Sequence, residues 1–231
     1  MQKIYFLSGT MCTIDLWQFI FPEIKNYKPV YIDITSAISF EEINTIINSK
    51  IEEPAILIGF SLGGFSALNF ASQYPEKIKK LIIIAASSKG LSEDEIKLRQ
   101  STISFLETHS YKGISKIRVQ QFLHPKNHHN NILIKIIKKM DAELGKDILI
   151  KQLTATSNRV DITEKLKSID NPILLIGSKE DSLVSHNDIT DLKKELKNSF
   201  SILVKQCGHM IPLEKPIEIA DIINNYLNDI V

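Results

Sequence analysis

The sequence predicts an α/β protein, in which a parallel β-sheet is covered by helices on both faces. Short, continuously apolar runs, such as Ala-Ile-Leu-Ile at 55–58, alternate with segments of helical periodicity. Strands that are buried on both faces of a parallel sheet have this composition. The chain has 231 residues, 43% of them hydrophobic, which is enough for one domain with a full core, or for one domain with an insertion.

Composition and charge exclude several classes of protein. The formal net charge is +1, and no basic run carries interleaved aromatics, so nucleic-acid binding is not expected. No apolar stretch approaches the roughly 20 residues of a membrane span, and the apolar patch after Met1 is shorter than a signal-peptide core. Cys12 and Cys207 are too few for a disulfide framework, so we expect a cytoplasmic protein.

Six strands are expected, each a short apolar run bounded by polar or small residues, at 4–7, 29–32, 55–58, 80–84, 172–177 and 201–204. A first helix is predicted from Asp15 to Phe19. A capping box of Ser39 and Glu42 opens a second. The last helix begins at Pro216. Its core-facing stripe consists of Ile219, Ile222, Ile223, Tyr226, Leu227 and Ile230.

The alternation of strands and helices breaks after the fourth strand. Residues 91–168 are helical in pattern without an evident strand, and a capping box of Ser92 and Glu95 lies at the start. We therefore expect a sheet core formed by 1–90 and 169–231, with a helical insertion at 91–168. Because open α/β sheets bind ligands at the carboxyl ends of their strands, this insertion is expected to form a lid.

Ser61 is the candidate nucleophile. It lies in Gly59-Phe60-Ser61-Leu62-Gly63, between a predicted buried strand and a predicted helix. Glycines two positions before and after a serine suit a sharp turn in which strand and helix backbones cross closely, and such a turn exposes the serine hydroxyl. The same pattern also occurs in tight turns without catalytic function, so the rest of the chain must supply the partners.

Two further strand ends carry a candidate acid and a candidate base. Asp181 follows the fifth strand and His209 follows the sixth. A serine hydroxyl needs a base within hydrogen-bond reach and a carboxylate to orient that base. Glu180 is the alternative to Asp181 as the acid. The chain order Ser61, Asp181, His209 differs from the orders in chymotrypsin-like and subtilisin-like enzymes.

On these motifs the sequence resembles the α/β-hydrolase superfamily over essentially its whole length. The resemblance implies a catalytic triad of Ser61, Asp181 and His209. It also implies an oxyanion hole formed by the backbone N–H groups of Leu62 and Thr10. One departure is Ser8, which stands before Gly9 where relatives commonly have histidine. That histidine supports the loop, so the departure concerns loop geometry.

Within the superfamily, the chain looks most like the small lidded esterases of the biotin pathway. This resemblance implies a serine carboxylesterase without a cofactor, acting on an acyl ester such as pimeloyl-[acyl-carrier protein] methyl ester. A lyase or carbon–carbon bond hydrolase would use the same triad and remains an alternative. A non-catalytic small-molecule receptor is the alternative from a different class.

Other residues have both a functional and a structural interpretation. Trp17 and Met11 are candidate substrate contacts, although an aromatic residue on a first helix is more often core. His124, His128 and His129 lack a carboxylate or cysteine at ligand spacing, so no metal site is expected. The basic lid residues either form ordinary solvated faces or dock an acidic carrier protein; they are Lys97, Arg99, Lys112, Lys116, Arg118, Lys126, Lys135, Lys138, Lys139 and Lys151.

Overall fold

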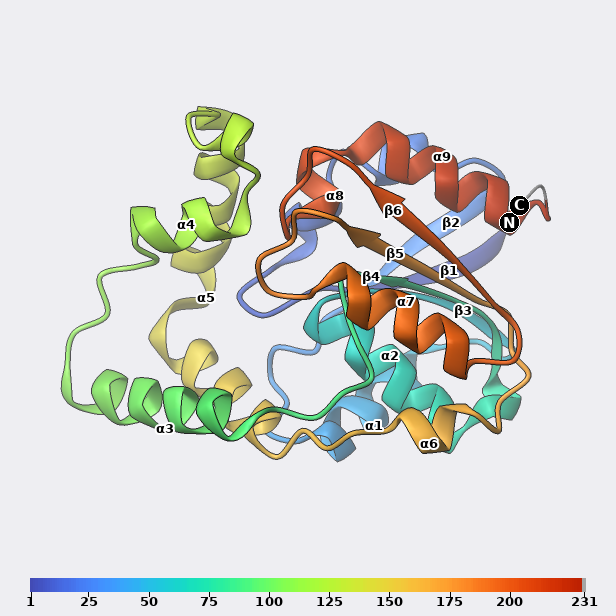
Figure 1. The fold of residues 1–231 in the computed structure, drawn as a ribbon, viewed down its shortest axis with the longest axis horizontal. Helices are drawn as coiled ribbons and strands as arrows, with labels where there is room; N and C mark the ends of the chain where they lie inside the picture. Colours follow the sequence, from blue (N-terminus) through green and yellow to red (C-terminus); the bar gives the residue numbers. More distant parts are fainter. Residues whose placement is uncertain (230–231) are drawn as a thin grey trace.

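The computed structural model describes residues 1–229 and contains a six-stranded sheet in which all neighbouring strands are parallel (Figure 1). The strand order is β2-β1-β3-β4-β5-β6. The strands are β1 (Gln2–Leu7), β2 (Tyr27–Ile32), β3 (Ala55–Phe60), β4 (Ile78–Ile84), β5 (Ile173–Ser178) and β6 (Ser199–Val204). The predicted α/β fold class and all six predicted strands are therefore confirmed.

Helices cover both faces of the sheet, as expected for strands without a polar face. The first face is covered by α1 (Phe40–Lys50), α2 (Leu62–Gln73), α6 (Thr163–Leu166) and α7 (His186–Glu195). The second is covered by the 3₁₀ turn η1 (Ile14–Trp17) and helices α8 (Ile211–Glu214) and α9 (Pro216–Leu227). Side chains alternate between these faces, so that Leu57 joins the first core and Ile58 the second.

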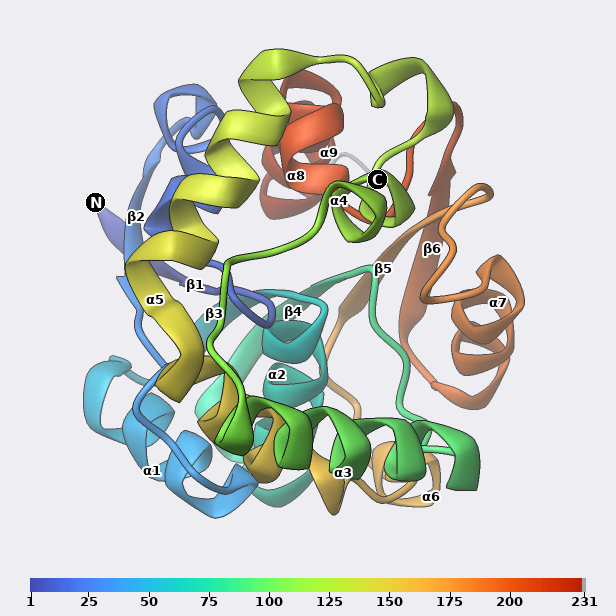
Figure 2. The ribbon, with the colours of Figure 1, turned by 90° about the vertical axis from the view of Figure 1, so that its left-hand side faces the viewer.

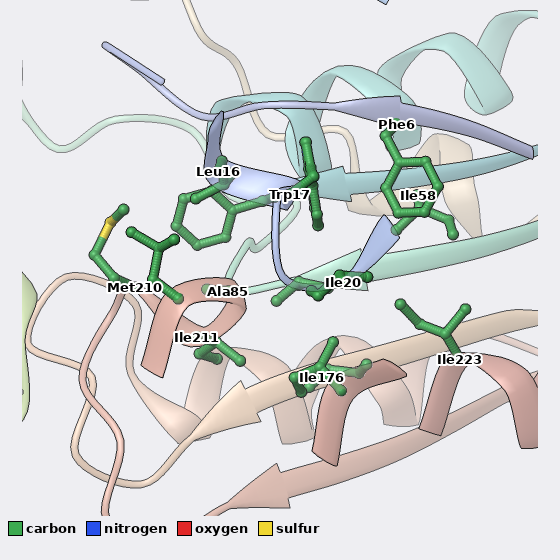
Figure 3. Close-up of a cluster of buried hydrophobic side chains, with 14 of the residues drawn as sticks. Phe6, Leu16, Trp17, Ile20, Ile58, Ala85, Ile176, Met210, Ile211 and Ile223 are labelled. Atoms are coloured by element: carbon green, nitrogen blue, oxygen red, sulfur yellow. The ribbon is translucent and has the colours of Figure 1, made fainter. Parts of the chain in front are cut away.

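The second core is shown in Figure 3. Phe6 and Ile58 from the sheet meet Trp17 from η1 and Ile223 from α9. Trp17 packs edge-on against Phe6, with ring centroids 4.9 Å apart. The predicted apolar stripe of α9 lies in this core, apart from Ile230, which is outside the described residues.

The predicted helix from Asp15 to Phe19 is wrong. Two 3₁₀ turns occupy this region, η1 and η2 (Phe21–Glu23). The Thr13 hydroxyl accepts a hydrogen bond from the Asp15 N–H, which starts η1. Pro22 then lies in the first turn of η2, and because proline has no N–H, a helix cannot continue through it.

A set of helices stands between β4 and β5: α3 (Glu93–Thr108), α4 (Lys116–Phe122), the turn η4 (Pro125–Asn127) and α5 (Asn131–Ser157). We call residues 93–157 the insertion. The predicted capping box of Ser92 and Glu95 opens α3. The insertion lies at the edge of the sheet toward which the strand arrows point (Figure 1), and seen from that side α3, α4 and α5 stand in front of the strands (Figure 2).

Helix α5 is two helical segments joined at Gly145, whose φ of 69° and ψ of −173° are not helical. Its first half contributes Leu133, Ile137 and Met140 to the core shared with η1. Its second half carries Gln152, which is 2% exposed. The break allows the two halves to follow different surfaces.

The turn from β3 into α2 brings three backbone segments into close contact. A Cβ atom added at Gly59 would lie 2.3 Å from the carbonyl oxygen of Gly63. A Cβ atom added at Gly63 would lie 2.3 Å from the carbonyl oxygen of Leu7, at the end of β1. Both positions therefore require glycine, because neither backbone can move without displacing a central strand.

We expect Gly63→Ala to lower the free energy of unfolding by about 3 kcal/mol or more, since overpacking against a rigid backbone is costly. Gly145→Ala is the matched control, because within residues 1–229 its added Cβ would meet no atom within 4 Å. Only its backbone conformation penalises the substitution, because a φ of 69° with a ψ of −173° is almost restricted to glycine and costs another residue about 1–3 kcal/mol. Urea denaturation of both variants tests this, and equal losses would contradict the steric explanation.

Candidate active site

Ser61 occupies the turn between β3 and α2 in a strained backbone conformation. Its φ is 52° and its ψ is −115°, values that residues other than glycine rarely adopt. The strain is held by two backbone hydrogen bonds, from Ser61 N–H to the Ile84 carbonyl at 2.9 Å and from Phe65 N–H to the Ser61 carbonyl at 3.0 Å. The hydroxyl thus stands at the N-terminus of α2, where the helix dipole favours negative charge.

His209 and Asp181 meet Ser61 at this turn. His209 Nε2 lies 3.1 Å from Ser61 Oγ, and His209 Nδ1 lies 2.8 Å from Asp181 Oδ2. The side chains of His209 and Asp181 are 5% and 1% exposed. Because a carboxylate only accepts hydrogen bonds, the neutral imidazole carries its proton on Nδ1 and leaves Nε2 free to accept the Ser61 proton.

Backbone donors and an aromatic ring fix the acid and the base. Asp181 Oδ1 accepts the N–H groups of Leu183 and Val184 at 2.8 and 3.1 Å. The Phe60 ring lies beside the imidazole, with a centroid distance of 5.0 Å. Glu180, the alternative acid, lies beside Ser178 at 3.4 Å instead. Of the two neighbouring carboxylates, Asp181 is the one in contact with His209.

The two expected oxyanion donors face no competing acceptor. Leu62 is the first residue of α2, so its N–H has no acceptor within the helix. Thr10 is exposed, and its N–H makes no hydrogen bond to any group in the described part of the chain. The next N–H along, that of Met11, is already bound, at 2.9 Å from Gln152 Oε1.

Ser8 supports the loop after β1. Its hydroxyl accepts the indole N–H of Trp17 at 2.9 Å and donates to the Thr13 carbonyl at 3.1 Å. The serine therefore connects both ends of this loop. Trp17 itself is completely buried in the core, so the structure does not bring it to Ser61 as a substrate contact. The Met11 side chain is half-buried, and the Met11 backbone has a positive φ of 56°, in the left-handed region.

The insertion contacts the loops that carry the acid and the base. The carbonyl of Gln121, in α4, accepts the Ser182 hydroxyl at 2.6 Å, next to Asp181. The carbonyl of Phe122 accepts the Met210 N–H at 3.1 Å, next to His209. These contacts tie α4 directly to both loops.

Glu214, in α8, strengthens this connection. Its Oε1 accepts the Gly208 N–H at 2.7 Å, next to His209. Its Oε2 accepts the His124 N–H at 2.9 Å and the Asn127 side-chain amide at 2.6 Å, both in the insertion. Every partner is a donor, which matches the acceptor-only chemistry of a carboxylate.

The cysteines and the remaining histidines serve structure. Burial raises the pKa of the Cys12 thiol to about 12 and also raises the pKa of Cys207, so both thiols are protonated near neutral pH. His124 Nδ1 accepts the Lys126 N–H, and His128 Nε2 contacts the Leu123 carbonyl. Within residues 1–229, no group of three His, Cys, Asp or Glu side chains is placed to hold a metal ion.

Sequence reasoning missed two of these residues. Glu214 follows His209 closely in the sequence, but its sequence position does not reveal that it bridges to the insertion. Gln152 is a polar residue between the apolar positions 149 and 153, and only the fold brings it to Met11. Neither contact has a local signal, because the partners lie 90 and 141 residues away.

We expect Glu214→Gln to lower the free energy of unfolding by about 1.5–3 kcal/mol, the contribution of a hydrogen bond to a charged group. An amide can accept on one side only, so its NH₂ must face the donors of either Gly208 or His124. Glu218→Gln is the control, because Glu218 forms only a partly exposed ion pair with Lys215 and should change stability by less than about 1 kcal/mol. Equal urea midpoints for the two variants would contradict this assignment.

Comparison with known proteins places the chain among hydrolases. It is 28% identical to pimeloyl-[acyl-carrier protein] methyl ester esterase from Wigglesworthia glossinidia brevipalpis, over 97% of this chain and 93% of the relative. It is 26% identical to 2-hydroxy-6-oxo-6-phenylhexa-2,4-dienoate hydrolase from Comamonas testosteroni, over 72% and 60% of the two chains. A thermophilic esterase from Thermogutta terrifontis has the same fold, with a TM-score of 0.88 at 15% identity over 99% of this chain and 90% of that one.

The family comparison covers most of the chain. A sequence model of the family described as serine aminopeptidase, S33, matches residues 24–216. This span includes β2 to β6, the insertion and the segments that carry Ser61, Asp181 and His209. The protein is therefore an enzyme of the hydrolase class, which sets aside the receptor alternative: the chain belongs to the serine aminopeptidase S33 family of α/β hydrolases.

Proposed function

We propose that this enzyme is a serine carboxylesterase that hydrolyses an acyl ester through an acyl-enzyme on Ser61. The observation that carries the proposal is the continuous contact from Ser61 Oγ through the His209 imidazole to Asp181, with distances of 3.1 and 2.8 Å. A serine hydroxyl next to a neutral, oriented imidazole can lose its proton as it attacks a carbonyl.

In the first half of the reaction, Ser61 Oγ bonds to the ester carbonyl carbon while His209 Nε2 takes its proton. The negatively charged oxygen that forms accepts hydrogen bonds from the backbone N–H groups of Leu62 and Thr10. The carbon–oxygen bond to the alcohol then breaks, and His209 returns the proton to the departing alcohol. Asp181 stabilises the imidazolium between these two proton transfers.

In the second half, His209 takes a proton from water, and the resulting hydroxide attacks the acyl carbonyl. The same two N–H groups hold the second oxyanion. The bond to Ser61 Oγ breaks, His209 returns the proton to Ser61, and the carboxylic acid leaves. No step requires a cofactor, since the chain supplies nucleophile, base and oxyanion donors.

We further propose that the insertion, residues 93–157, acts as a lid above Ser61 and that the sheet core acts as the catalytic domain. The end of the predicted lid range 91–168 belongs to the core, because α6 packs on the sheet. The position of α3, α4 and α5 in front of the strand ends supports this division (Figure 2). Contacts of α4 with the loops of Asp181 and His209 also support it.

The candidate substrate is pimeloyl-[acyl-carrier protein] methyl ester, the compound named for the Wigglesworthia relative. The insertion offers exposed cations to an acidic carrier protein. Those that form no ion pair within residues 1–229 are Lys112, Lys116, Arg118, Lys126, Lys135, Lys138 and Lys151. Lys139, by contrast, is bound to Asp15 at 2.6 Å.

A carbon–carbon bond hydrolase is the second candidate. The substrate named for the Comamonas relative contains no ester, so its hydrolysis must cleave a carbon–carbon bond. Such an enzyme would also contain a reactive serine. Absence of ester turnover, combined with labelling of Ser61 by a fluorophosphonate, would favour this second candidate.

We expect Ser61→Ala to reduce kcat for short p-nitrophenyl esters by about 10⁴-fold or more, because the nucleophile is lost. Ser72→Ala is the control, since its hydroxyl bonds only to the Asn69 carbonyl within the same helix. Initial rates and fluorophosphonate labelling of both variants measure the effect. Wild-type turnover by Ser61→Ala would disprove the proposed mechanism.

We expect kcat/KM for the carrier-bound methyl ester to fall about 10-fold or more between low and high salt, since charge accelerates encounter. Charge reversal by Lys135→Glu with Lys138→Glu should produce a similar fall at low salt. Lys193→Glu, an exposed position on α7, is the control. The free methyl ester should respond to neither change, and equal salt dependence of free and carrier-bound esters would argue against docking on the insertion.

A further inference from the structure

Gln152 links the insertion to the loop that follows β1. It lies in the second half of α5, is 2% exposed, and its Oε1 accepts the Met11 N–H at 2.9 Å. Met11 directly follows Thr10, whose N–H is assigned to the oxyanion above. We propose that Gln152 is a positioning residue: by fixing the Thr10–Met11 peptide, it restricts rotation about Thr10 and so holds the adjoining Gly9–Thr10 peptide, which carries the Thr10 N–H, in the orientation needed for oxyanion binding. This inference rests on the proposed function.

The loop needs such a support because Met11 has a left-handed backbone, with φ of 56°. This conformation is unfavourable for a residue with a side chain. The other contacts of the loop are a backbone bond from Cys12 N–H to the Gly9 carbonyl at 3.1 Å and the Cys12 thiol beside the Thr10 carbonyl at 3.5 Å. Gln152 provides the side-chain acceptor for the Met11 N–H, which fixes the plane of the peptide.

The side chain of Gln152 is only half satisfied. Its Nε2 is buried and has no hydrogen-bond partner in the described part of the chain. A buried donor without a partner is unfavourable, and an apolar side chain at this place would avoid that cost. The contact that distinguishes glutamine from an apolar residue here is the one from Oε1 to Met11.

The second half of α5 is itself firmly held, so Gln152 can act as a support. The Thr156 hydroxyl donates to the Gln152 carbonyl at 2.8 Å. Arg99, from α3, donates to the same hydroxyl. Helices α3 and α5 are thus connected next to Gln152. The Thr156 side chain is part of this connection and forms no hydrogen bond to the loop after β1.

The test compares Gln152→Met with Ser157→Ala. The first substitution keeps the length of the side chain and removes the acceptor for Met11. The second removes a hydroxyl in the same half of α5, which donates to the Leu153 carbonyl at 2.7 Å within the helix. With short p-nitrophenyl esters, we expect Gln152→Met to lower kcat about 10–100-fold, part of the roughly 100–1,000-fold effect of losing an oxyanion donor. KM should change by less than about 2-fold, because the oxyanion exists only in the transition state.

A boronic acid that forms a tetrahedral adduct with Ser61 gives a second readout. Its inhibition constant should rise in Gln152→Met by a factor similar to the fall in kcat, while Ser157→Ala should match the wild type in both. Equal kcat values for the two variants would overturn the proposal. Ser61→Ala, measured beside them, separates this outcome from failure of the proposed function, which would appear as retained turnover in that variant alone.

If Gln152→Met does not fold, Gln152→Asn takes its place as the test variant. It keeps the amide but is one methylene too short to reach Met11 from the same backbone. Loss of kcat in Gln152→Asn at an unchanged melting temperature would support the positioning role. Unchanged kcat in Gln152→Asn would overturn it.

Discussion

The active site depends on the close approach of three backbone segments: the end of β1, the end of β3 and the first turn of α2. Gly63 meets the Leu7 carbonyl, and Gly59 meets Gly63, at distances that exclude any side chain. This contact forces the left-handed turn at Ser61. It also places the loop after β1 beside the N-terminus of α2, so the nucleophile and both expected oxyanion donors come from segments that touch. The steric constraint therefore determines the geometry of the chemistry.

Around this contact, the insertion holds each of the other loops. Gln152 binds the loop after β1, the Gln121 carbonyl binds Ser182 next to Asp181, and the Phe122 carbonyl binds Met210 next to His209. Glu214 adds a charged connection between the histidine loop and η4. The insertion thus contributes hydrogen bonds to the frame of the site as well as standing in front of the strands (Figure 2). Hydrogen-bonded neighbours of this kind keep reacting groups at productive distances.

Much of this could be predicted from the sequence. Continuous apolar runs identify all six strands, because buried parallel strands have no polar face, and the elbow around Ser61 has a local glycine pattern. The contacts of Gln152 and Glu214 could not be predicted, since they depend on how the insertion is rotated over the sheet. Periodicity identifies a helix without fixing that rotation. Two short 3₁₀ turns replace the helix expected from Asp15, and a helix cannot continue through Pro22, which has no N–H.

The break at Gly145 has a consequence for how enzymes of this shape can diversify. It divides α5 into a first half that packs into the core with Trp17 and a second half that supports the loop after β1. Because the helical hydrogen-bond ladder is interrupted between them, rotation or lengthening of one half is not transmitted rigidly to the other. The exposed face of the first half can therefore change during evolution without moving Gln152, while α4 and the second half of α5 keep the loops of the reaction centre in place.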